Sequence, residues 1–278
     1  MIDIRKEMKD MQEITHVFNR HEIKYILDEA QYQEVMDGIG DHMIPDPHGR
    51  STVCNIYYDT PDDRLVRRSL EGPVYKEKIR LRSYGTAKED SIVFLELKKK
   101  YHGIVYKRRI ELPEHSANEY MQGSMPLSKL LESMTEGSSP QIAREIDSFK
   151  TFYGSLQPSV YLSYDRSAFY SQEDESLRIT FDQNIRYRKD RLKLTEDQDG
   201  ERLIDSQSHL LEIKTASALP VWLTNVLSKA KVRPSGFSKY GRVYQTLLSS
   251  RINSARQVQQ ETIRLSACNA LPVPGISS

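Results

Sequence analysis

The feature that most constrains the fold is a period-two alternation of charged and apolar residues. The segment KEKIRLRSY places Lys78, Arg80 and Arg82 on one face of an extended strand and Ile79 and Leu81 on the other. Turn-forming residues separate such segments, as is typical of an antiparallel sheet. The alternation predicts eight strands, over residues 18–27, 52–58, 76–84, 92–100, 104–112, 159–170, 177–186 and 208–214.

Other segments have helical spacing, and the sequence after residue 253 has no convincing periodic face. A chain of 278 residues can form a single all-β unit with flanking helices. We therefore expect an N-terminal segment over 1–17, one domain over 18–253 and a flexible tail over 254–278. The predicted helices cover residues 28–38, 127–134, 142–153, 220–229 and 240–253.

The overall charge excludes a strongly basic protein, because 40 Lys and Arg residues face 39 Asp and Glu residues. A nucleic-acid-binding function is therefore disfavoured, and any anion site has to arise from local sorting of charge. Cys54 and Cys268 belong to no metal-binding spacing, and no segment has the apolar length of a signal peptide or a membrane span. We expect a reduced, cytoplasmic protein without direct membrane insertion.

The charged faces recur on six strands, and two interpretations compete. One face of an antiparallel sheet commonly meets water, which would explain any single strand. A row such as Lys78, Arg80 and Arg82, however, stacks like charges about 7 Å apart and repels itself unless an anion compensates it. We therefore expect an α+β fold: a closed eight-stranded antiparallel barrel with a basic interior and helices outside.

Polyphosphate suits such an interior, because Arg and Lys bind phosphoryl oxygens and stabilise phosphoryl transfer without a covalent nucleophile. Mn²⁺ or Mg²⁺ would complete the charge balance, held by one or two carboxylates and by the phosphates. The P-loop, the dinucleotide-binding, the zinc-protease and the nucleophile-elbow motifs are absent from the sequence. The available carboxylates are Glu22, Glu96, Asp182 and Glu212.

An ordered set of motifs resembles a known family. RHEIKY, YYDT, KIRLRSYG, FLELKKK, KRRIEL, SYDRSAF, LRITFD, LLEIK and FSKYGR follow one another as in the VTC domain. The sequence resembles a bacterial member of the VTC polyphosphate-polymerase family, within the triphosphate tunnel metalloenzymes that include the CYTH phosphatases. The resemblance implies an eight-stranded tunnel, polyphosphate bound by basic residues, and Mn²⁺ or Mg²⁺ held by a glutamate on a late strand.

The resemblance also implies roles for individual residues. Arg20 replaces the first glutamate of the ExExK motif that opens CYTH enzymes, which disfavours a two-metal hydrolase. The expected metal ligands are Glu212 and Glu22. The expected catalytic residues are Arg80, Arg82, Lys24, Lys98, Lys214 and Glu212, and the expected substrate-binding residues are Lys78, Lys107, Arg109, Arg166, Arg178 and Lys239.

Three functions stay open at this point. The first is a metal-dependent polymerase that transfers the terminal phosphate of ATP to polyphosphate, with ATP and inorganic polyphosphate as its partners. The second is a phosphohydrolase acting on tripolyphosphate or a nucleoside triphosphate, and the third is a non-catalytic polyphosphate-binding module. Protein partners and the oligomeric state are not predicted.

Overall fold

The computed structural model describes residues 21–102 and 104–269. Its body is a nine-stranded sheet in which each pair of neighbouring strands is antiparallel. The strands are β1 (His21–Leu27), β2 (Met43–Asp59), β3 (Tyr75–Tyr84), β4 (Ile92–Tyr101), β5 (Ile104–Pro113), β6 (Gln157–Ser171), β7 (Arg178–Arg188), β8 (Glu201–Arg202) and β9 (His209–Thr215).

The strand order corrects the prediction of a closed barrel. Hydrogen bonds join the strands in the order β1-β9-β7-β6-β2-β3-β4-β5, with β8 paired to β7. In the described part of the chain no backbone pairing joins β1 to β5, so the sheet is not closed by hydrogen bonds. The alternation fixes which face each side chain takes, but it does not say which two edges meet.

The eight predicted strands are confirmed, with small shifts at their ends, although residues 18–20 of the first lie outside the described residues. Two elements differ more. β2 begins at Met43 and contains irregular pairing with β6 between Pro45 and Arg50, which hid its first half from the alternation. β8 has two residues, which is too short for a periodic signal.

Seven helices accompany the sheet in the described part of the chain, and two of them, α3 and α4, were not predicted. The last helix continues to Asn269, where the sequence analysis expected a tail from residue 254; the end of that tail lies outside the described residues. The helices are α2 (Glu29–Ile39), α3 (Arg64–Leu70), α4 (Glu114–Gln122), α5 (Leu127–Ser133), α6 (Pro140–Tyr153), α7 (Val221–Lys229) and α8 (Lys239–Asn269).

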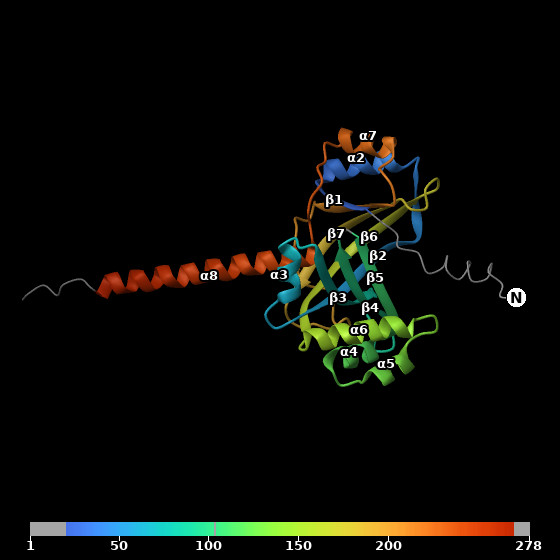
Figure 1. Ribbon diagram of the computed structural model, residues 1–278. Helices are drawn as coiled ribbons and strands as arrows, with labels where there is room; N and C mark the ends of the chain where they lie inside the picture. Colours follow the sequence, from blue (N-terminus) through green and yellow to red (C-terminus); the bar gives the residue numbers. More distant parts are fainter. Residues whose placement is uncertain (1–20, 103, 270–278) are drawn as a thin grey trace, which may run out of the picture.

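The apolar faces of the strands are covered by helices on two sides of the body, as predicted. Leu81 and Leu95 of the sheet share a core with Ile146 of α6, and α4 and α5 join the same core. On the other side, Ile213 of β9 shares a second core with Val35 of α2, which α7 also joins. Figure 1 shows these two helical groups at opposite ends of the body with the strands between them. The charged face of the sheet is therefore left to line the interior.

The segment between α7 and α8 lies along the free edge of β1. The Ser235 amide donates to the Lys24 carbonyl at 2.7 Å, and Pro234 pairs with Tyr25 in an isolated antiparallel bridge. On its other side, the Lys78 ammonium of β3 donates to Ser238 Oγ at 2.9 Å. This segment thus joins β1 to β3 without extending the sheet, and we call it the seam segment (residues 234–238).

Helix α8 begins at the seam segment and projects away from the body (Figure 1). Its first turn packs against α3, and Gly241 makes this possible because a Cβ there would lie 2.8 Å from Leu70 Cδ2. None of the helices among the described residues is both long and apolar enough to cross a membrane.

Candidate functional site

The charged face of the sheet forms the candidate site. Antiparallel partners in register point to the same face, so the pairing places the charged residues in rows. One row contains Lys78, Lys98 and Lys107 on three successive strands. The next row contains Tyr57, Arg80, Glu96 and Arg109.

The deepest cluster surrounds two buried carboxylates, Asp182 of β7 and Glu212 of β9. Arg166 of β6 holds Asp182 through two parallel hydrogen bonds, Nε to Oδ1 at 2.6 Å and Nη2 to Oδ2 at 2.7 Å. Lys239, the first residue of α8, lies 3.0 Å from Glu212 Oε1 and also pairs with Asp182. Lys24 of β1 approaches the same Glu212 oxygen at 3.4 Å. Five elements, β1, β6, β7, β9 and α8, therefore meet at these carboxylates.

The cluster fixes the charge state of its members. Burial alone would raise the pKa of Glu212, but Lys239, Lys24 and Arg166 hold this pKa well below its usual range. Burial lowers the pKa of Lys239, yet Asp182 and Glu212 outweigh it and raise this pKa above its usual range. Both groups are ionised at neutral pH, as a compensated buried ion pair requires.

A second cluster surrounds Glu96 of β4. Arg80 binds it at 2.7 Å through Nη2, and the Lys107 ammonium lies 2.6 Å from its other oxygen. Arg80 also donates to the Tyr57 hydroxyl at 2.9 Å. Arg82 is buried and donates to Asn55 Oδ1 at 3.0 Å, which holds its guanidinium in place.

Two lysines in the interior lack a carboxylate partner. In the described part of the chain, neither Lys78 nor Lys214 forms an ion pair, and of these two ammonium groups only that of Lys78 makes a hydrogen bond, to Ser238. Burial, with the neighbouring Lys98 and Lys24, lowers the pKa of Lys78 to about 8 overall, although Tyr57 opposes this shift. Burial likewise lowers the pKa of Lys214 to about 8, although Glu212 opposes this. Such ammonium groups are stabilised when an anion enters.

One ion pair crosses the interior from β4 to β1. The Lys98 ammonium lies 3.4 Å from Glu22 Oε2, and the other Glu22 oxygen lies 3.0 Å from Lys24. Burial raises the pKa of Glu22, but Lys98 and Lys24 lower it to about 2 overall. The sheet therefore curls far enough for its two halves to face each other across the site.

Three predicted substrate-binding residues lie at the margin of this arrangement. Lys107 and Arg109 are both exposed, with Arg109 paired to Glu111 at 3.0 Å and its guanidinium 4.5 Å from the Phe94 ring centre. Arg178 is exposed at the start of β7, opposite Lys214 in register, and forms no ion pair within the described residues. The other predicted site residues lie together in the interior: Glu22, Lys24, Lys78, Arg80, Arg82, Lys98, Arg166, Glu212, Lys214 and Lys239.

The structure adds interior residues that the sequence analysis missed. Tyr164 accepts a hydrogen bond from Arg82 at 3.3 Å, and Asn55 and Tyr57 orient Arg82 and Arg80. The signal that could have found two of them is the alternation in TVCNIYYDT, which puts Asn55 and Tyr57 on one face. Thr180, the register partner of Glu212, is buried and its hydroxyl has no hydrogen-bond partner in the described chain.

A divalent metal fits this site if phosphate supplies part of its coordination. No group of three His, Cys, Asp or Glu side chains within the described ranges could hold an ion. Glu212 and Glu22 nevertheless provide hard oxygens on either side of Lys24, and the unpartnered Thr180 hydroxyl lies opposite Glu212 in register. Mg²⁺ is commonly bound by one or two carboxylates together with substrate phosphates. The donor set is consistent with an ion of that kind.

The arrangement can bind an extended polyanion and stabilise charge that develops on it. Guanidinium groups fixed by Glu96, Asn55 and Asp182 are preorganised donors, which need no reorganisation when a phosphoryl group moves. Lysines without carboxylate partners supply the uncompensated positive charge. No protein side chain has to act as a covalent nucleophile in such chemistry.

Solved structures with a similar arrangement of elements have low sequence identity to this chain. A Pyrococcus horikoshii OT3 protein is 12% identical with a TM-score of 0.40, covering 82% of this chain and 99% of that one. The Mimivirus capping enzyme triphosphatase is 10% identical with a TM-score of 0.33, covering 83% of this chain and 97% of that one. Both TM-scores lie below 0.5, so the likeness carries no argument about chemistry.

Among curated proteins, the chain is similar to vacuolar transporter chaperone complex subunit 4 of Trypanosoma cruzi (strain CL Brener). The two are 25% identical over 212 residues, which cover 62% of this chain. The matched region covers 26% of that relative, so this chain spans about a quarter of its length.

The sequence pattern of the VTC domain matches residues 19–248. This range contains every strand of the sheet, both carboxylate clusters and the start of α8. The resemblance drawn from short motifs is thereby confirmed at the level of the family: this chain belongs to the VTC domain family.

Proposed function

We propose that this protein is a metal-dependent polyphosphate polymerase that transfers the terminal phosphate of ATP to a polyphosphate chain. The observation that carries the proposal is the row of Lys78, Lys98 and Lys107, which runs from the interior to its margin, with Lys214 near it and with more cations than carboxylates in the interior. A row of like charges is unfavourable unless an anion with regularly spaced charges lies along it. A phosphate chain has such spacing.

The transfer needs positioned donors on the moving phosphoryl group. The bond between the γ-phosphorus and the β–γ bridging oxygen breaks, ADP leaves, and a terminal oxygen of the chain forms the new bond to phosphorus. Arg80 and Arg82 are held by Glu96 and Asn55, so they can stabilise the spread negative charge of the transition state. Lys78 and Lys214 can hold the flanking phosphates.

The metal would be held by Glu212 and, on the far side of Lys24, by Glu22. A bound Mn²⁺ or Mg²⁺ would neutralise charge on the β- and γ-phosphates. Lys239 and Arg166 would keep the Glu212 carboxylate ionised and oriented, and the Thr180 hydroxyl, which has no partner among the described residues, lies opposite Glu212 in register. The protein groups would thus supply part of the coordination of the metal ion, and phosphate oxygens would supply the rest.

The test is incubation of the purified protein with ATP and Mn²⁺ or Mg²⁺, with and without a short polyphosphate primer. Products are resolved by size, and ADP and free phosphate are quantified separately. Long chains with stoichiometric ADP establish the polymerase, whereas free phosphate without chains establishes the hydrolase. Glu212→Gln should abolish turnover and retain binding of polyphosphate. Binding without turnover in the wild-type protein at every metal tested overturns both enzymatic functions.

A further inference from the structure

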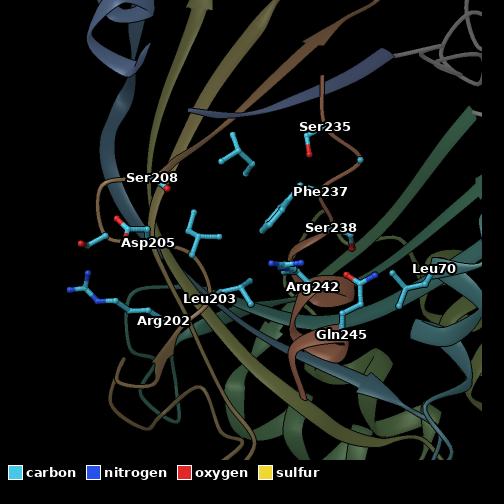
Figure 2. Close-up of a pocket in the computed structure, with 14 residues that line it drawn as sticks. Leu70, Arg202, Leu203, Asp205, Ser208, Ser235, Phe237, Ser238, Arg242 and Gln245 are labelled. Carbon is cyan, nitrogen blue, oxygen red and sulfur yellow. The ribbon is translucent and has the colours of Figure 1, made fainter. Parts of the chain in front are cut away.

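A large cavity lies where the seam segment meets α8. Its volume is about 870 Å³, and its walls come from the seam segment, the first turns of α8, the end of β1 and the connection from β8 to β9. Ile26, Leu70 and Leu203 supply apolar walls, while Arg242 and Gln245 of α8 supply polar ones. Figure 2 shows the Phe237 ring between the seam segment and the β8–β9 connection, with Arg242 beside it.

The cavity adjoins the interior through one residue. Ser238 lines the cavity, and its hydroxyl accepts a hydrogen bond from Lys78 at 2.9 Å. The next residue, Lys239, extends to the Asp182 and Glu212 carboxylates. A ligand seated in the cavity can therefore reach the basic row with a short, charged extension.

Resting on the proposed function, we propose that this cavity binds the nucleoside part of a nucleoside triphosphate whose phosphates enter the interior past Lys78. Phe237 is half-buried against the core beneath it, so one part of its ring remains free to meet a base. A base stacked on an aromatic ring needs no matching hydrogen bonds, because every base has a π-face. The cavity volume falls within the usual range for small-molecule sites.

The charges of the cavity favour the same ligand. Arg242 is exposed in the first turn of α8, and its amide donates to the Ser238 carbonyl, so it lines the cavity near Ser238, where the first phosphate would lie. Asp205 and Ser206 line the cavity from the β8–β9 connection, with Asp205 across from Ser238 in Figure 2, and they can form hydrogen bonds to ribose hydroxyls. An inorganic phosphate chain has neither a base nor a ribose and would leave the cavity empty.

The experiment compares ATP with inorganic tripolyphosphate, each with Mg²⁺, by titration calorimetry. Phe237→Ala removes the stacking surface and is expected to weaken ATP binding about tenfold and to leave tripolyphosphate binding unchanged. Ser235→Leu fills the cavity from the seam segment and keeps the backbone hydrogen bond to Lys24. It should therefore also weaken ATP binding and leave tripolyphosphate binding unchanged. Phe152→Ala on α6 is the matched control, because its ring is 70% exposed and lies outside the cavity.

The outcomes separate this inference from the proposed function. If folded Phe237→Ala and Ser235→Leu proteins lose affinity equally for ATP and tripolyphosphate, the nucleoside site is overturned. The same holds if neither ligand loses affinity. Both results leave the proposed phosphate binding in the interior unaffected. If wild-type protein binds neither ligand, the proposed function fails and the nucleoside site fails with it. Circular dichroism and thermal unfolding establish that each variant is folded.

Discussion

Lys239 Nζ lies 3.0 Å from Glu212 Oε1, and both side chains are buried. The two residues come from α8 and β9, so the contact attaches the start of the projecting helix to the centre of the sheet. Since Asp182 shares the same ammonium, Lys239 is a major counter-charge for two buried carboxylates.

Lys239→Met should therefore destabilise the protein strongly. Removing one partner of a buried ion pair leaves an uncompensated charge, which costs about 3–5 kcal/mol. We expect a loss of this size in the free energy of unfolding, measured with a chemical denaturant. Lys193→Met removes an exposed lysine and should change stability little. Equal stability of the two variants would show that Arg166 and Lys24 compensate the carboxylates without Lys239.

Lys214→Met should have the opposite effect on stability while weakening anion binding. The pKa of Lys214 is lowered from 10.5 to about 8 in the folded protein, so its charged form is disfavoured there. The destabilisation caused by charged Lys214 is fully present below its pKa of about 8 in the folded protein, and it disappears as the pH rises toward the value of 10.5 in the unfolded chain. At pH 7 the variant should gain on the order of 1–3 kcal/mol in free energy of unfolding. Tripolyphosphate binding, measured on the same samples, should fall at least tenfold. A variant that is less stable and binds normally would contradict a binding role for Lys214.

Anion binding should take up protons near pH 8. The pKa values of Lys78 and Lys214 are lowered to about 8, so each ammonium is half-deprotonated at that pH before the anion enters and protonated afterwards. Titration calorimetry in two buffers of different ionisation enthalpy should show that Lys78→Met or Lys214→Met each reduces the proton uptake by about half a proton. At pH 6 the difference between wild type and variant should vanish. A difference that stays constant with pH would show that neither lysine titrates in this range.

Thr180→Val should separate ligand contact from packing. The buried Thr180 hydroxyl has no partner in the described chain, so its replacement by a methyl group of similar shape should leave stability unchanged or slightly higher. If the hydroxyl contacts the metal or a phosphate, turnover should fall about tenfold. Thr151→Val on exposed α6 surface is the control. Unchanged turnover in the Thr180 variant would assign the residue to packing alone.

The strands and the composition of the charged face could be predicted because alternation is a local property of the sequence. Helix α3 could not, because it begins at a capping contact made by a residue outside the helix. It begins where Asp59, six residues before Leu65, accepts hydrogen bonds from the amides of Leu65 and Val66 at 2.8 and 3.0 Å. Pro61 and Asp62 mark the turn between them in the sequence, but they do not show that the turn brings Asp59 to the start of a helix.

The sequence predicted which residues belong to the site better than it predicted which of them form ion pairs and hydrogen bonds with one another. Lys24, Arg166 and Glu212 were each identified from their own strands, but their meeting at one carboxylate depends on pairing between β1, β9, β7 and β6. Tyr164 was missed for the same reason, because a polar residue becomes informative only once Arg82 lies beside it. The open edge of the sheet is likewise a property of long-range pairing.

That open edge has a mechanical consequence. A barrel closed by a strand ladder can widen only by breaking backbone hydrogen bonds along its whole length. Here the two halves are held across the seam by Lys98 with Glu22, by Lys78 with Ser238 and by a short contact at β1. Partly exposed ion pairs exchange with water at a cost of about 1 kcal/mol or less each. The distance between the two edges can therefore change by exchange of these side-chain contacts, without loss of the backbone hydrogen bonds between the strands.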